Sequence, residues 1–202
     1  MVRLFVGLDI PDQIIYDLAP ARGGVEGAHW QRDNQLHMTL AFIGDVSGKT
    51  GREIEDALAR IRFTPFQLSL NGVGLFGKPK HPKALWAGVE DRKPLLHLHE
   101  KIVSALDRID VETERRKFKP HVTLARFRRG AQARVGDWLT NNEILHTAKA
   151  EISNFVLFSS ERTSEGSYYR HEAIFSAIGA DVFNEADLPE YSGNMWPAYN
   201  AI

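Results

Sequence analysis

The sequence predicts an α+β protein built from two similar halves, with mainly antiparallel sheets. The first observation behind this prediction is a repeated motif, His-Met-Thr-Leu at residues 37–40 and His-Val-Thr-Leu at residues 121–124. The second is that each copy lies in an apolar run typical of a strand. The third is that similar elements surround both copies, as an internal duplication would produce.

The first half opens with an apolar, β-prone strand over residues 4–10. A proline follows it and predicts a helix over residues 12–18, because proline is favoured where helices begin. A glycine-rich turn then leads to the first motif strand, residues 36–43. Gly44 and Gly48 are expected to close that strand.

A helix is predicted next over residues 52–61, where apolar residues recur at helical spacing. Residues 66–70 alternate like a strand, which the glycines beyond it are expected to interrupt. These glycines are Gly72, Gly74 and Gly77. Residues 78–83, Lys-Pro-Lys-His-Pro-Lys, predict a rigid basic loop before a further strand at 84–89.

The second half begins at a proline, and its apolar stripe over residues 95–106 predicts an amphipathic helix. The second motif strand, 122–127, follows. A shorter helix is predicted at 131–141, and strands at 152–158 and 168–178 complete the half.

We therefore expect one bilobal domain over residues 1–178, with lobes built mainly from about 1–92 and 93–178, each carrying one motif. Residues 179–202 form an acidic, aromatic C-terminal segment without Lys or Arg. A flexible tail and a segment packed on its own domain or on a neighbouring chain are both compatible with that composition.

Composition narrows the function classes. Hydrophobic residues make up 43% of the 202 residues, which is ordinary for a soluble globular protein. The formal net charge of −1 provides no global attraction for nucleic acid or membrane, so anion binding needs a local patch. The absence of cysteine excludes disulfides, thiolate metal sites and a cysteine nucleophile. The apolar N-terminus is too short to span a bilayer and lacks a small-residue cleavage site. We expect a cytoplasmic monomer with no membrane partner.

The repeated motif carries the chemistry. Alternation along a strand places His37 and Thr39 on one face and, in the second copy, His121 and Thr123 on one face. If the copies face each other, they provide two proton-transfer groups and two hydroxyl donors. That set suits cleavage of a phosphodiester without a metal or another cofactor. A single histidine on a strand is usually structural, so the prediction depends on the repeat.

The other six histidines are interpreted as surface or structural residues: His29, His81, His97, His99, His146 and His171. His97 and His99 resemble a metal pair in sequence. They lie in a predicted helix, however, where residues two apart do not face each other, and no carboxylate cluster completes a site.

A basic cluster brackets the second motif: Arg115, Arg116, Lys117, Lys119, Arg126, Arg128 and Arg129. It is interpreted either as a solvated face or as a phosphate track. A regular strand would aim Arg126 away from His121, and a bulge would be needed to return it as a phosphate contact. By the same alternation Phe42 shares the face of Met38 and is expected in the core.

Further segments extend the pattern: Arg3-Leu-Phe-Val-Gly-Leu-Asp-Ile-Pro11, Leu36-His-Met-Thr-Leu-Ala-Phe-Ile-Gly44, Gly72-Val-Gly-Leu-Phe-Gly77, Leu85-Trp-Ala-Gly-Val89, Phe118-Lys-Pro-His-Val-Thr-Leu-Ala-Arg126 and Leu157-Phe-Ser-Ser160. Over about residues 2–178 the chain resembles the two-histidine (2H) phosphoesterase superfamily. Within it the chain is most similar to the bacterial and archaeal RNA 2′,3′-cyclic phosphodiesterases, also described as 2′–5′ RNA ligases.

The resemblance implies an α+β fold that is bilobal, with two pseudo-symmetric lobes of mainly antiparallel sheets and flanking helices around a central cleft. It also implies metal-independent opening of an RNA or nucleotide 2′,3′-cyclic phosphate to a 2′-phosphomonoester. It implies that His37 is the proton donor and His121 the proton acceptor, and that Thr39 and Thr123 bind the phosphate. Ordinary imidazole pKa values near 6.5 then predict an optimum between about pH 6 and 8. Ligation by the reverse reaction and a non-catalytic RNA-end-binding module remain alternatives.

Overall fold

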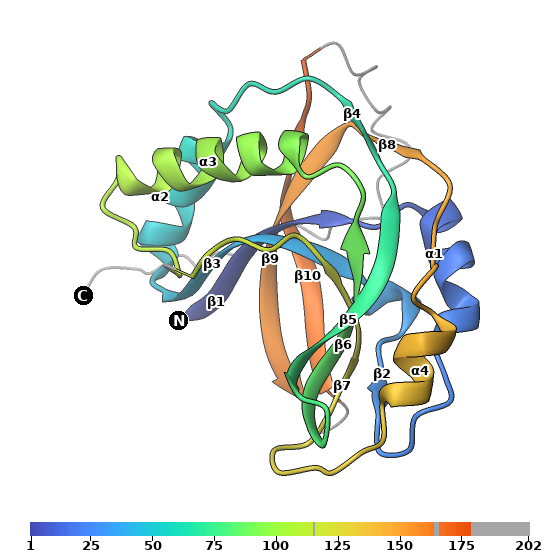
Figure 1. Cartoon of the computed structure of the whole chain (residues 1–202). Helices are drawn as coiled ribbons and strands as arrows, with labels where there is room; N and C mark the ends of the chain where they lie inside the picture. The colour runs from blue at the N-terminus through green and yellow to red at the C-terminus, as the bar shows by residue number, and fades with distance from the viewer. Residues whose placement is uncertain (115, 164–165, 179–202) are drawn as a thin grey trace.

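The computed structural model describes residues 1–114, 116–163 and 166–178, so the predicted tail at 179–202 lies outside the described residues (Figure 1). The elements of the first half are β1 (Val2–Asp9), α1 (Asp12–Leu18), η1 (Ala19–Ala21), β2 (His29–Trp30), η2 (Asp33–Gln35), β3 (His37–Val46), α2 (Gly48–Leu58), β4 (Phe66–Leu68), β5 (Leu70–Lys78) and β6 (His81–Val89). Those of the second half are α3 (Lys93–Asp107), β7 (Val122–Arg126), α4 (Gly136–Asn141), β8 (Ala150–Ile152), β9 (Asn154–Thr163) and β10 (Gly166–Ser176).

The strands form two four-stranded sheets, in the orders β10-β9-β1-β3 and β2-β7-β6-β5, and a small β4-β8 pair. The strand pairings described in all three sheets are antiparallel. The α+β prediction is therefore confirmed.

The predicted division of the lobes near residue 92 is wrong for the sheets. The first sheet joins β1 and β3 to β9 and β10, and the second joins β5 and β6 to β7. Each sheet thus takes strands from both halves of the sequence. In the first sheet β9 pairs with the N-terminal strand β1 through Phe5–Phe158 and its neighbours, and in the second β7 pairs with β6. Each sheet still carries one motif strand.

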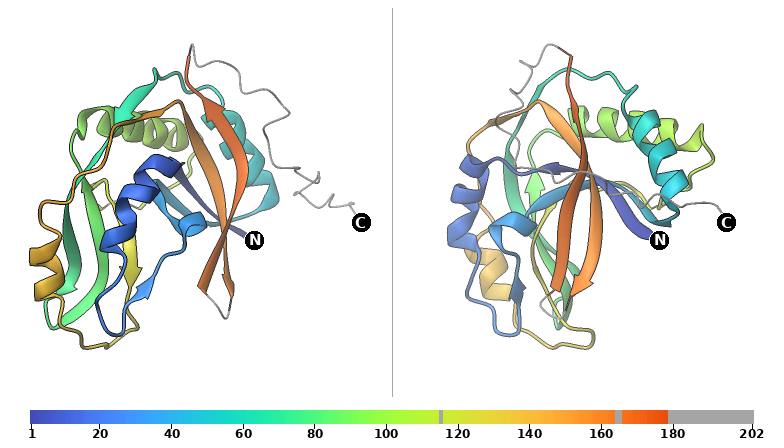
Figure 2. Two further views of the ribbon diagram at one scale, coloured as in Figure 1. Left: turned by 90° about the vertical axis from the view of Figure 1, so that its right-hand side faces the viewer. Right: turned by 180° about the vertical axis from the view of Figure 1, so that it is seen from behind.

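Helices α2 and α3 pack together, and α3 also contacts β3; α1 and α4 lie at the other end of the molecule (Figures 1 and 2). The indole Nε1 of Trp138 in α4 donates to the carbonyl of Ala21, which fixes α4 beside η1. Strand β3 is the edge of its sheet and contacts β7 of the other sheet. This contact brings the two motifs together. No helix in the described parts of the chain is long and apolar enough to cross a bilayer.

Several predicted boundaries were wrong. Strand β3 continues through Gly44 to Val46, and α2 begins at Gly48, because the Ser47 hydroxyl caps it by accepting from the Thr50 backbone N–H. Strand β5 runs unbroken through its glycines, and only two residues separate it from β6, so the basic loop at 78–83 is mostly strand. Helix α4 is shorter than predicted because the chain becomes helical only at Gly136.

Candidate active site

The first motif histidine is fixed at the start of β3. His37 pairs with Asp9 of β1 in the strand register. Its Nδ1 atom lies 2.8 Å from the carbonyl oxygen of Gln35. A carbonyl oxygen only accepts, so Nδ1 carries the hydrogen and Nε2 is the nitrogen left to gain or lose a proton.

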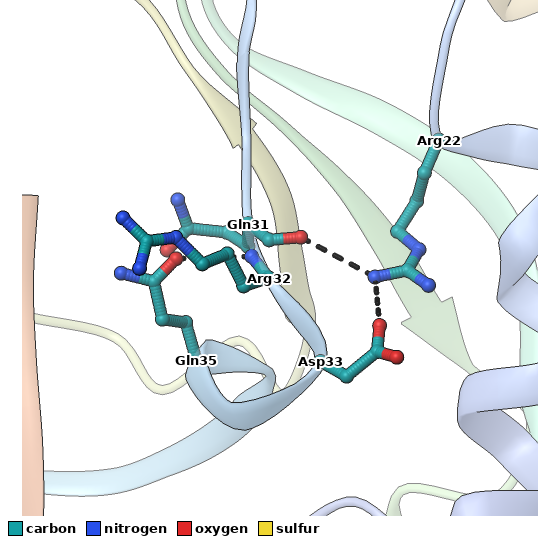
Figure 3. Close-up of polar contacts among 5 residues, drawn as sticks. All are labelled: Arg22, Gln31, Arg32, Asp33 and Gln35. Atoms are coloured by element: carbon teal, nitrogen blue, oxygen red, sulfur yellow. Dashed lines mark hydrogen bonds and ion pairs between the residues drawn. The ribbon is translucent and has the colours of Figure 1, made fainter.

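The turn before β3 holds Gln35 in place (Figure 3). The Arg22 guanidinium contacts the Asp33 carboxylate at 2.5 Å and the Gln31 carbonyl at 3.3 Å. The Gln35 side chain accepts from the Arg32 backbone N–H and donates to the Ser167 carbonyl of β10, each at 2.9 Å. The carbonyl that orients His37 therefore belongs to a turn tied to two other segments.

The second motif histidine repeats this arrangement. His121 stands one residue before β7, and its Nδ1 lies 2.6 Å from the Lys119 carbonyl. In both motifs the histidine thus donates to the carbonyl two residues earlier, and Nε2 is free of that bond. The predicted strand, 122–127, likewise begins one residue after His121.

Aromatic rings surround both imidazoles, and more of them enclose His37. Its ring lies 4.7 Å from Tyr169, 5.0 Å from Phe5 and 6.0 Å from Phe158, measured between centroids. Three side chains of the first sheet therefore remove water from this imidazole.

His121 contacts the rings of Phe76 and Trp86, at 4.8 and 6.1 Å between centroids. Gly74 makes room for Trp86, because a Cβ there would clash with the indole ring. The glycine that seemed to interrupt the strand therefore supports the second histidine.

A β-bulge occurs at the same place in each motif. Beside β1, Thr39 pairs with Gly7 and Ala41 with Val6, so Leu40 is left out of the register. Beside β6, Thr123 pairs with Trp86 and Ala125 with Leu85, so Leu124 is left out. A bulge inserts one residue and resets the alternation of faces beyond it.

The bulges decide which side chains reach the cleft. The residue five positions after each histidine, Phe42 or Arg126, returns to the cleft side. The bulge that Arg126 needed is therefore present. The prediction that Phe42 is core is wrong, since it is 48% exposed.

A cleft of about 570 Å³ lies between the two motif strands. Its lining residues are Thr39, Leu40, Ala41, Phe42, Phe76, Ala84, His99, Thr113, Glu114, Arg116, Lys117, Phe118, Lys119, His121, Thr123 and Arg126. The structure thus brings four of the five predicted site residues to one surface. His37 is not part of the lining and sits deeper, beside the Phe5 cluster.

Electrostatics couple the two histidines. Burial lowers the pKa of His37 from 6.5 to about 4, helped by the charges of Arg126 and His121 and opposed by the Gln35 hydrogen bond and Asp9. Burial also lowers the pKa of His121, and Arg126 adds to this against the Lys119 hydrogen bond. Arg126 therefore acts on both rings. The expected optimum at pH 6–8 has to move toward acid.

Two cleft residues were missed by sequence reasoning. His99 was assigned a surface or structural role and Phe42 a core role, yet both line the cleft. Both motifs continue as Thr-Leu-Ala, so two consecutive apolar residues interrupt the strand alternation. The structure buries both residues in each copy, and this break in the alternation was the available sign of a bulge. Among the described residues no three His, Asp or Glu side chains are grouped to hold a metal ion.

Comparisons with known proteins agree with this architecture. A family model described as the 2′-5′ RNA ligase superfamily matches residues 10–163. The RNA 2′,3′-cyclic phosphodiesterase of Archaeoglobus fulgidus is 30% identical over 177 residues, which cover 86% of this chain and 99% of the relative. The protein of the same name from Aeropyrum pernix is 34% identical over 141 residues, 68% of this chain and 80% of the relative.

Solved structures share the fold. A protein of Thermus thermophilus superposes with a TM-score of 0.72 at 24% identity, covering 89% of this chain and 100% of its own. The Escherichia coli protein LigT, solved with 3′-AMP, gives 0.69 at 24% identity, covering 88% of this chain and 98% of its own.

Proposed function

Because the chain belongs to the 2′-5′ RNA ligase superfamily, we propose that it hydrolyses the 2′,3′-cyclic phosphate at the end of an RNA to a 2′-phosphomonoester, without a metal ion. The observation that carries the proposal is the matched fixation of two histidines beside one cleft, each with its Nδ1 bonded to a carbonyl. The relatives from Archaeoglobus fulgidus and Aeropyrum pernix are named for this activity, which supports the same assignment here.

In the proposed reaction, Nε2 of His121 takes a proton from a water molecule while the water oxygen forms a bond to phosphorus. The bond from phosphorus to the ribose 3′ oxygen breaks, and Nε2 of His37 gives its proton to that oxygen. One water is consumed, and the product carries a 2′-phosphate and a 3′-hydroxyl. Each positioned proton transfer of this kind contributes roughly 10²–10⁴-fold to the rate.

Binding of the substrate phosphate favours protonation of His37, the proposed proton donor. In the free protein the low pKa of His37 keeps its imidazole neutral at neutral pH. The positive charge of Arg126 disfavours a protonated His37. An anionic phosphate beside Arg126 offsets that charge and so raises the pKa of His37. Substrate binding and acquisition of the proton are therefore linked.

The remaining cleft groups suit the non-bridging phosphate oxygens. Arg126 can donate charge-assisted hydrogen bonds, and the hydroxyls of Thr39 and Thr123 can donate to oxygens that gain charge in the transition state. Lys117 and Lys119 extend positive charge along the same cleft, in which Arg116 is paired with the Glu114 carboxylate at 2.6 Å. That extension suits the backbone of an RNA leading to the reacting end.

Ligation is a second candidate, because the description of the matched family names it. A 5′-hydroxyl would take the place of water, and His37 and His121 would serve the reverse reaction by microscopic reversibility. Hydrolysis is preferred because it needs only one nucleic acid strand in the cleft.

The test incubates the protein with an RNA ending in a 2′,3′-cyclic phosphate, in EDTA, with and without a second strand ending in a 5′-hydroxyl. We expect ³¹P NMR to show a 2′-phosphomonoester in both mixtures. A joined strand would instead favour ligation. A 3′-phosphate would contradict the proposed bond cleavage, and loss of activity in EDTA that a divalent ion restores would contradict the metal-free reaction. An intact protein that binds the RNA end and leaves it unchanged would indicate a binding module.

A further inference from the structure

A third histidine reaches the cleft from helix α3. The Nδ1 atom of His99 lies 2.8 Å from the carbonyl oxygen of Leu40, and its side chain is half-buried in the cleft lining. Because the carbonyl accepts, Nδ1 of His99 carries the hydrogen. Leu40 is the bulged residue of the first motif, directly after Thr39. His99 therefore bonds the point at which β3 changes its face.

One face of this imidazole contacts the segment that leads to the second motif. The rings of His99 and Phe118 stack with centroids 4.1 Å apart and planes 11° apart. Phe118 belongs to residues 113–119, called here the basic strap, of which Arg115 lies outside the described residues. The strap carries the Lys119 carbonyl that orients His121. His99 is thus in contact with both halves of the site.

The strap also touches β3 directly. The backbone N–H of Glu114 donates to the Phe42 carbonyl at 3.1 Å. The described attachments of the strap to β3 therefore include a backbone bond at Phe42 and a side-chain connection, through His99, at Leu40. The cleft residues Thr39 and Phe42 lie on either side of Leu40, which His99 bonds.

In the second motif a backbone N–H, and not a histidine side chain, bonds the bulged residue. The carbonyl of its bulged residue, Leu124, accepts from the Gln31 backbone N–H at 2.8 Å, just beyond β2. Strand β3 is the edge of its sheet, so none of the described strands lies beside Leu40 on the outer side. At Leu40 the His99 imidazole supplies the hydrogen-bond donor that the Gln31 backbone supplies at Leu124.

We propose that His99 is a positioning residue of the active site, which holds the first motif bulge and the basic strap at a fixed separation. The inference rests on the proposed function for its kinetic readout. The Nδ1 hydrogen bond fixes Thr39 and Phe42 through Leu40, and the ring stack fixes Lys119, and through it His121, by way of Phe118. The two contacts are separable by substitution.

The kinetic test compares His99→Phe, which keeps a stacking ring and removes the donor, with His99→Asn, whose amide donates from about the place of Nδ1. On 2′,3′-cyclic AMP we expect His99→Phe to lower kcat by between about 10-fold and 100-fold with little change in KM, because it misplaces a cleft group without removing one. His99→Asn should recover part of that loss, because its amide restores the donor while the stacking ring is still missing. The control His97→Ala, an exposed histidine on the same helix, should retain wild-type kinetics.

Hydrogen exchange gives a readout that needs no activity. Exchange in residues 113–119 should rise in His99→Asn, which lacks the ring, and stay protected in His99→Phe. Wild-type kcat in His99→Phe, no recovery in His99→Asn, or unchanged strap exchange in His99→Asn would overturn the inference. If the wild-type protein leaves every 2′,3′-cyclic phosphate intact, the proposed function fails, and hydrogen exchange still decides whether His99 holds the strap.

Discussion

The two motif copies share one backbone design and differ in the side chains it presents. In both, a histidine Nδ1 donates to the carbonyl two residues earlier, and a bulged leucine follows the threonine. The second position after the bulged leucine carries Phe42 in one copy and Arg126 in the other. The repeat thus supplies a symmetric frame, and one substitution within it gives the cleft an aromatic wall and a cationic wall.

The copies also differ in the surroundings and the pKa of their imidazoles. Burial among three aromatic rings lowers the pKa of His37 to about 4, and burial at the edge of the cleft lowers the pKa of His121. A shared motif therefore does not mean a shared proton affinity. Two unequal sites that influence each other can hold one proton between them, as acid–base catalysis requires.

The strongest test of this comparison removes each imidazole. Despite their unequal surroundings, His37→Ala and His121→Ala should each lower kcat by at least about 10²-fold, because each removes one proton transfer. The exposed His81→Ala serves as control, and thermal unfolding reports whether each variant is folded. Wild-type kcat in either variant would remove that histidine from the mechanism.

We expect the next largest effect from Arg126, because we propose that it binds the phosphate and because its charge lowers the pKa of both histidines. Arg126→Gln should cost about 2–3 kcal/mol in kcat/KM, the worth of charge-assisted hydrogen bonds. Removing the positive charge should also raise the pKa of both imidazoles and move the pH profile toward alkali. Arg128→Gln, outside the cleft lining, is the matched control. A lower rate with an unmoved profile would contradict the electrostatic role.

The threonines test whether the two copies contribute alike to the phosphate. Thr39→Val and Thr123→Val should each cost about 1.5–3 kcal/mol, the worth of a hydrogen bond to a charged group. The loss should appear in kcat if the bonds tighten in the transition state. The exposed Thr64→Val gives the baseline. Changes confined to KM would mean that the hydroxyls bind substrate and transition state equally.

Phe42 should give the smallest effect. Its exposed ring can stack on a nucleobase, so Phe42→Ala should weaken binding by roughly 1 kcal/mol, seen as a few-fold higher KM for 2′,3′-cyclic AMP with kcat retained. The exposed aromatic control is Tyr16→Ala. An unchanged KM would leave Phe42 as part of the cleft wall with no base contact.

The sequence predicted the parts of the fold that depend on local pattern. The helix at Asp12–Leu18 and the two motif strands follow from a proline start and from apolar runs. The pairing of β1 with β9 could not be predicted, because strand order depends on contacts between distant residues. The lobes were therefore divided incorrectly.

The candidate site divides in the same way. His37, His121 and the two threonines were found because the motif repeats. Phe42 was misplaced because strict alternation ignores a bulge. His99 was missed because only the packing of α3 on β3 brings it to Leu40.

The central claim is that His37 and His121 share one proton, and the pH dependence of kcat/KM tests it most directly. The measurement covers pH 4 to 9 on a 2′,3′-cyclic nucleotide in EDTA. Above both pKa values neither imidazole can donate a proton, and below both neither can accept one. Because both values lie below 6.5, the account predicts a bell whose maximum lies on the acid side of 6.5 and whose acid limb falls near pH 4. A flat profile, or a maximum above pH 7, would contradict it.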